Sequence, residues 1–186
     1  MRSLRPLFFG CMVLLWPLVA QCAPQAGHTG SARHLSTHPL KMEAHSEGNL
    51  SVDFFPLPDG AQILGTQSGA TLNLGKVSYA GQPEHTGITL KHSSQSFSVQ
   101  TAIGIRIGTG NFAGETVQLK AWLEVPAEPY HIYFDNVPMT LQPQLVNSHT
   151  QLGIITRHEL NITVPQNTSE SQSAFRTMIS LQVIRN

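Results

Sequence analysis

The stretch "SFSVQTAIGIRIGTGNFAGETVQLKAWLEV", residues 96–125, decides the fold class of this chain. In its first half the apolar residues stand at odd positions from Phe97 to Ile107, and the positions between them are polar or small. The second half alternates in the same way from Val117 onward, with Trp122 as the exception. Because successive side chains of an extended strand point to opposite faces, this period of two predicts two β-strands, each with one buried face.

A glycine-rich segment separates the two strands, and it has two possible meanings. A dinucleotide site needs G-x-G-x-x-G between a strand and a helix, whereas here the spacing is G-x-G-x-x-x-G and a strand follows. We therefore expect the turn of an antiparallel hairpin that pairs strand 97–107 with strand 117–125, because glycine supplies the positive φ angles of a tight reversal. The hairpin turn is assigned to Gly108, Gly110 and Gly114.

Six further segments alternate less regularly, and turn-forming residues such as Pro58-Asp59-Gly60 and Asp135-Asn136 separate them. Short strands with frequent turns and no amphipathic helix predict an all-β fold, a single antiparallel immunoglobulin-like β-sandwich of about seven to nine strands. A small barrel is the alternative. The six segments are residues 49–54, 70–79, 87–92, 130–134, 159–164 and 177–186.

The N-terminus has the pattern of a secretory signal peptide, which we assign to residues 1–22. Arg2 and Arg5 precede an apolar run of about fourteen residues, shorter than the roughly 18–20 that span a bilayer. We therefore expect a secreted protein, with no stable membrane span after cleavage. A lipoprotein signal ending at Cys22 is the competing interpretation, although Gln21 stands where such signals carry a small residue.

Residues 23–48 are rich in His, Gly, Ser, Thr and Pro, and we expect a flexible N-terminal arm ahead of a sandwich domain of residues 49–186. The histidines of the arm allow transition-metal binding, but no carboxylate or cysteine completes a ligand set at fixed spacing. The favoured interpretation is a polar tail. No metal and no cofactor is predicted.

The charge and cysteine content indicate which partners are not expected and how the mature domain must be stabilised. Without the signal the chain keeps nine lysines and arginines against eleven aspartates and glutamates, a net charge of −2. This near-neutral balance gives no electrostatic reason to expect nucleic acid or an acidic membrane as a partner. Both cysteines, Cys11 and Cys22, fall in the signal, so the mature domain must be stabilised without a disulfide.

No arrangement of residues in the sequence indicates catalysis, and we predict that the protein is not an enzyme. The chain lacks a G-x-S-x-G elbow, and its carboxylates are spread along the predicted strands and turns. The segment "AEPYHIYFDN" interleaves aromatic and polar residues that could stack on sugar rings. Tyr130 and Tyr133 are therefore candidate ligand-face aromatics, although strand alternation alone explains the segment.

The signal, the polar arm, the short-stranded sandwich and two alternating runs near the C-terminus together resemble bacterial fimbrial and coat-type subunits. These are pilin-like proteins assembled by periplasmic chaperones. The resemblance implies a sandwich that lacks one strand, with the gap filled first by a chaperone strand and then by the N-terminal extension of the next subunit. The two runs are Leu160, Ile162, Val164 and Ile179, Leu181, Val183.

Strand pairing is accordingly the expected mode of interaction, and the expected partners are a periplasmic chaperone and further copies of this chain. We expect a structural, pilus- or coat-like surface protein, with adhesion as a possible extension. The alternative is a monomeric extracytoplasmic binding module for carbohydrate or protein. The candidate assembly residues are Leu50, Val52, Phe54, Ile179, Leu181 and Val183.

Overall fold

The computed structural model describes residues 34–35, 40–46, 48–65, 67–75, 77–78, 81–108, 115–165 and 177–186. The predicted signal peptide, residues 1–22, lies outside them. The described part of the chain contains fourteen strands, eight of which have five or more residues, and no helix. The all-β prediction is therefore confirmed, and the number of strands exceeds the predicted seven to nine. Within these residues no helix is long and apolar enough to cross a membrane.

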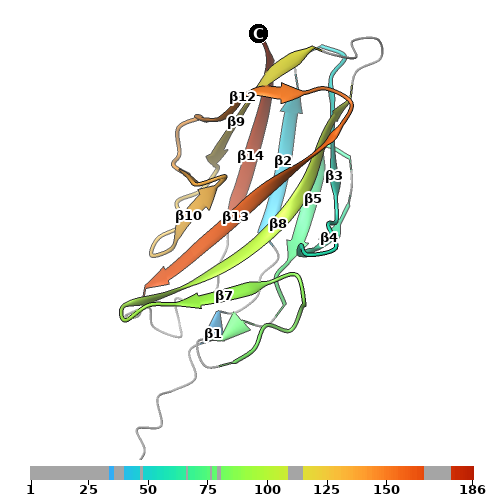
Figure 1. Ribbon diagram of the computed structural model, residues 1–186. Coiled ribbons are helices and arrows are strands. Elements are labelled where there is room, and N and C mark those ends of the chain that lie inside the picture. Colours follow the sequence, from blue (N-terminus) through green and yellow to red (C-terminus); the bar gives the residue numbers. More distant parts are fainter. Residues whose placement is uncertain are drawn as a thin grey trace, which may run out of the picture.

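Two six-stranded sheets make up most of the fold (Figure 1). The β14 sheet has the order β12 (Gln144–Gln151), β9 (Thr116–Leu123), β14 (Met178–Arg185), β2 (Leu40–Ser46), β5 (Gly69–Asn73) and β4 (Gln62–Leu64). The β8 sheet has the order β11 (Val137–Pro138), β10 (His131–Phe134), β13 (Ile155–Pro165), β8 (Ser96–Gly108) and β3 (Ser51–Phe55), and β7 (Thr89–His92) also pairs with β8. A separate short pair joins β1 (His34–Leu35) and β6 (Val77–Ser78).

The apolar faces of the two sheets meet in one core, which gives the molecule its sandwich form. Alternate residues of β9 are buried along its whole length, as its sequence pattern predicts. Full burial of one large aliphatic or aromatic side chain stabilises a fold by about 1.5–3 kcal/mol, so this core carries the stability that a disulfide would otherwise supply. Its largest fully buried side chains include Phe54, Phe134, Leu40, Met42, Ile103, Leu119 and Leu160.

The predicted hairpin between β8 and β9 is wrong, because the two strands lie in different sheets. β8 pairs with β13, β3 and β7, whereas β9 pairs with β12 and β14. The glycine-rich segment therefore connects the two sheets, and Gly110 and Gly114 lie outside the described residues. Gly108 is the last residue of β8, and it faces Ser51 so closely that a Cβ there would stand 2.5 Å from the serine hydroxyl.

The assignment of residues 23–48 to a flexible arm is wrong for its last part, because Leu40–Ser46 forms β2 inside the β14 sheet. β2 runs parallel to β14, so the prediction of a purely antiparallel fold is also wrong. The stretch "LKMEAHS" does alternate, with Leu40 and Met42 buried and Lys41 exposed. The alternation covers few residues and follows a long polar tract, which is why the sequence pattern did not reveal it.

The two-residue turn predicted at Asp135-Asn136 is present between β10 and β11. Both residues have positive φ, 49° and 64°, and the flanking pair is Phe134 with Val137. This is the geometry of a type I′ hairpin, which Asn and Asp tolerate better than other side chains. In the other sheet, the pairing of β12 with β9 is irregular, with register shifts after Leu145 and after Asn147.

β8 is buried on both faces near its middle, where the alternating pattern of burial gives way to five consecutive buried residues, 101–105. Two connecting segments pack against the strand there. One carries Gly60 and the other Gly87, and the backbones of these two glycines touch each other. The hydroxyl of Thr101 donates a hydrogen bond to the carbonyl of Gly87 (2.9 Å), which fixes the second segment to β8.

We expect Gly87→Ala to lower the free energy of unfolding by about 1–3 kcal/mol, because the new methyl group would collide with the backbone of Gly60. Gly69→Ala is the matched control, since its Cβ would meet only ordinary contacts at 3.7 Å or more. Urea unfolding of the two variants measures the difference. Equal midpoints would show that the two segments do not hold each other in place.

Candidate functional site

β2 fills a slot between two strands that do not pair with each other. On one side it pairs in parallel with β14, from Lys41 opposite Met178 to Ser46 opposite Val183. On the other side it pairs antiparallel with β5 over four residues. An unpaired strand edge presents a row of backbone donors and acceptors that readily accepts another strand. Without β2, the β14 sheet would therefore be divided into two parts with an open edge on each.

The side chains of β2 match the slot. Leu40 and Met42 are fully buried in the core, and Ala44 packs partly against it. On the outward face, the ring of His45 stacks on Trp122 of β9 with centroids 6.1 Å apart. The strand thus contributes apolar anchors on one side and an exposed polar face on the other, which is the pattern of a strand added at a sheet edge.

The connection between β2 and the rest of the fold is short. β2 ends at Ser46 in one sheet, and β3 begins at Ser51 in the other. Between them Gly48 adopts a positive φ of 66°, and the Ser46 hydroxyl donates a hydrogen bond to the carbonyl of Leu50 (2.6 Å). Short hinge loops of this kind favour the exchange of a terminal strand between copies.

The structure separates the six predicted assembly residues into two groups. The three on β14 are fully buried and belong to the strand that pairs with β2. The other three precede or belong to β3, which pairs with β8 in the opposite sheet, so they do not line the slot. The strand that does fill it, β2, was missed by the sequence analysis. The first group is Ile179, Leu181 and Val183, and the second is Leu50, Val52 and Phe54.

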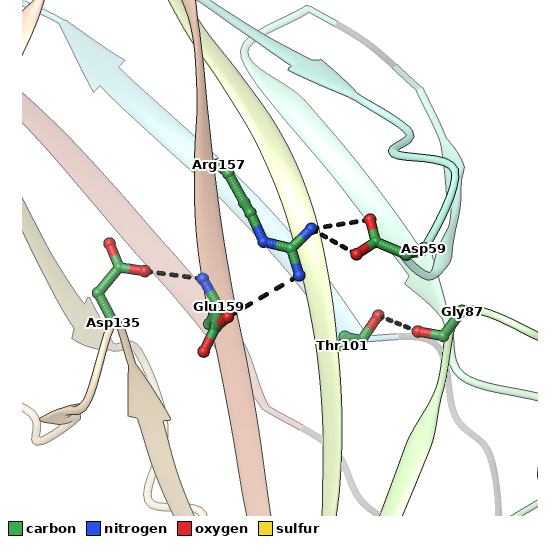
Figure 2. Close-up of polar contacts among 6 residues, drawn as sticks. All are labelled: Asp59, Gly87, Thr101, Asp135, Arg157 and Glu159. Carbon is green, nitrogen blue, oxygen red and sulfur yellow. Dashed lines mark hydrogen bonds and ion pairs between the residues drawn. The ribbon is translucent and has the colours of Figure 1, made fainter.

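A second candidate site is a polar hollow of about 200 Å³ on the outer face of the β8 sheet. Figure 2 shows its charged part, where Arg157 of β13 extends toward Asp59 on the segment that covers β8. Arg157 Nη1 donates to both carboxylate oxygens of Asp59 at 2.7 Å, and its Nη2 lies 3.8 Å from Glu159 Oε1. Two carboxylates therefore share one guanidinium, which leaves a net charge of −1.

The Arg157 hydrogen bonds hold the pKa of Asp59 below its ordinary value, and Asp59 in turn raises the pKa of Arg157. The side chain of Arg157 is 48% exposed, and that of Asp59 is 65% exposed. Ion pairs this open to solvent contribute little to stability. These charges are consequently free to serve binding, and they can be replaced without loss of the fold.

A buried polar network lies on the inner side of β13. His158 Nδ1 is 2.6 Å from Asp135 Oδ2, and His158 Nε2 is 2.8 Å from Thr156 Oγ1. The order of carboxylate, imidazole and hydroxyl is that of a hydrolase triad. However, His158 is only 2% exposed and stacks on Phe134, and the Thr156 hydroxyl also donates to the Ile105 carbonyl at 3.0 Å. The network fastens the β10–β11 hairpin to β13 and offers no opening to a substrate.

The two predicted ligand-face tyrosines differ in position. Tyr130 is 6% exposed, and burial raises its pKa, so its assignment to a ligand-binding face is wrong. It belongs to the core because it stands two residues before Ile132 and so shares the inward side of the buried Ile132 and Phe134. Tyr133 lies on the outward face of β10, between the buried Ile132 and Phe134, and it stands directly opposite Asn161 of β13.

Comparisons of the chain with family models, with curated proteins and with solved structures gave no match. In the part of the chain that the structure describes, no three His, Cys, Asp or Glu side chains gather closely enough to hold a metal ion. The function must therefore be argued from the β2 slot and the polar hollow themselves.

Asp135→Asn should lower the free energy of unfolding by about 1–3 kcal/mol, because the carboxylate accepts hydrogen bonds from both His158 and the Glu159 amide. Asparagine tolerates the positive φ of this turn, so the change tests the hydrogen bonds alone. Asp59→Asn, at an exposed carboxylate, should leave the unfolding midpoint nearly unchanged. Equal effects of the two variants would contradict a structural role for the network.

The Asp59 carboxyl should titrate below the ordinary aspartate value of 3.8, as followed by its carboxyl carbon shift in NMR. Its pKa is lower in the folded chain than in the unfolded one. The small stabilisation from the ion pair is therefore present above the unfolded pKa and is lost as the pH falls through the lower, folded value. Arg157→Gln should return the pKa toward 3.8, whereas Arg106→Gln, which removes the partner of Asp53, should leave it unchanged.

Proposed function

We propose that this protein is a secreted structural subunit of a bacterial surface assembly, and that copies are joined by the exchange of β2. In this proposal the domain is an immunoglobulin-like sandwich whose β14 sheet is completed by the N-terminal strand of a neighbouring copy. A periplasmic chaperone strand fills the slot before assembly. The observation that carries the proposal is that β2 alone bridges β14 and β5, on a short hinge.

Exchange preserves the contacts of β2, because the strand enters an identical slot with the same register. Leu40 and Met42 are buried in the same core positions whichever copy supplies them. Insertion within one chain has the advantage of a high effective concentration, so it dominates in dilute solution. When copies are concentrated, or are delivered by a chaperone, insertion of β2 into the slot of another copy is favoured.

Exchange of β2 between copies produces an open-ended row of subunits. Each copy that gives its β2 to a neighbour leaves its own slot to be filled by another copy. Such a contact is heterologous, because it joins two different surfaces, and a contact of this type continues into a fibre unless a rotation closes it into a ring. One repeated contact is therefore sufficient to build an extended assembly.

A cysteine pair across β2 and β14 distinguishes the two modes of insertion. His45 and Gln182 stand opposite each other in the register, and both sequence cysteines fall in the predicted signal peptide. For the mature chain carrying His45→Cys and Gln182→Cys, we expect oxidation at rising protein concentration to give a covalent ladder on non-reducing gels. A synthetic peptide of residues 38–48, added in excess, should shorten the ladder because it occupies the slots.

The matched control is Lys120→Cys with Gln182→Cys, a pair between β9 and β14 that exchange of β2 does not separate. This control should give internally crosslinked monomer at every concentration. If the His45→Cys, Gln182→Cys chain also gives only crosslinked monomer in concentrated samples, β2 stays in its own chain and the proposed assembly is wrong.

A further inference from the structure

A row of polar and aromatic residues crosses four strands on the outer face of the β8 sheet. The register places Tyr133 of β10 opposite Asn161 of β13, Asn161 opposite Gln100 of β8, and Gln100 opposite Thr89 of β7. Side chains directly opposite each other on one face of a sheet have Cβ atoms about 4.5–5.5 Å apart. A phenol ring, two carboxamides and a hydroxyl therefore form a continuous strip, none of it needed by the core.

The polar hollow lies along this strip. Thr89, Gln100 and Asn161 line it. Arg157 and Asp59 also line it, and Figure 2 shows the ion pair between them. Ala102 of β8, which stands opposite Glu159, contributes only a methyl group to the lining. The hollow is smaller than the roughly 300–1,000 Å³ of sites for drug-sized ligands, so it has room for one small ring.

The charges of the hollow exclude several ligand classes. Arg157 is already engaged by two carboxylates, so the site has a net charge of −1 and no free guanidinium for a phosphate, a sulfate or a carboxylate. Both carboxylates are paired with Arg157, and Tyr133 is the one aromatic residue of the strip, so an ammonium group would find neither an unpaired carboxylate nor an aromatic cage. A neutral ligand is the class that remains.

The hydrogen-bonding groups match hydroxyls, which both donate and accept. The carboxamides of Gln100 and Asn161 offer donors and acceptors, and the two carboxylates offer acceptors. Asn161 Oδ1 is buried and has no hydrogen-bond partner, a costly condition that a rotation of the amide toward a bound hydroxyl would relieve. The ring of Tyr133 provides a surface against which the C–H face of a sugar can pack.

We propose that this hollow binds a neutral saccharide, with one pyranose ring held between the two carboxamides and the Asp59–Arg157–Glu159 group, and the adjoining residue of the glycan over Tyr133. The site is independent of the proposed β2 exchange, because it lies on the outer face of the other sheet. An assembly of copies would then present one such site on every subunit.

The test is a titration of the ¹⁵N-labelled mature protein, followed by amide chemical shifts, with the methyl glycosides of glucose, galactose and mannose and with N-acetylglucosamine. Glucuronic acid, N-acetylneuraminic acid and inorganic sulfate form the anionic arm. We expect saturable shifts at residues 100, 159 and 161 with at least one neutral sugar, and none with the anions. The complete absence of saturable shifts with the neutral sugars, stronger binding of an anion, or shifts confined to another surface would overturn the proposal.

Variants make the assignment specific to the hollow. Asn161→Ala and Gln100→Ala should each weaken binding about tenfold, the loss expected when one hydrogen bond to the ligand is removed. Gln118→Ala, an outward-facing amide on β9 of the other sheet, is the matched control and should bind as the parent does. Asp59→Asn provides a second variant at an exposed position, where loss of folding is not expected. Equal affinity in all four variants would also refute the site.

Discussion

The architecture depends on the backbone hydrogen bonds that β2 makes on both of its edges. Among the described strands, β2 is the one that joins β14 to β5, so the donors and acceptors that face the slot are paired because residues 40–46 lie between them. Unpaired backbone groups at a buried edge are costly, and the two apolar anchors Leu40 and Met42 add core packing to the same strand. A short N-terminal segment thus completes both the sheet and the core.

The sequence predicted the strands well and their partners poorly, for a single physical reason. Alternation reports which side chains face the core, and it correctly located β8, β9, β13 and β14. It contains no information on which strand supplies the neighbouring backbone. Two strands that are adjacent in the chain and bury the same kind of face can pair as a hairpin or lie in opposite sheets, as β8 and β9 do. The glycines between β8 and β9 are compatible with both arrangements, a hairpin turn and a connection between sheets.

The candidate sites were predictable to different degrees. Ile179, Leu181 and Val183 were identified from alternation, whereas β2 was hidden in a histidine-rich tract with only a few alternating positions. The outward direction of Tyr133 followed from strand geometry, and the same alternation places Tyr130 inward with Ile132 and Phe134, so its assignment to a ligand-binding face was an error. The hollow draws residues from β7, β8, β13 and the segment that carries Asp59, and no local pattern in the chain brings those four together.

The irregular pairing of β12 bears on how the molecule avoids uncontrolled aggregation. β12 forms one edge of the β14 sheet, and its register with β9 slips twice within eight residues. A strand distorted in this way is a poor template for a further strand, so sheets of neighbouring molecules cannot easily merge along it. Strand pairing between molecules along this edge of the sheet is thereby disfavoured.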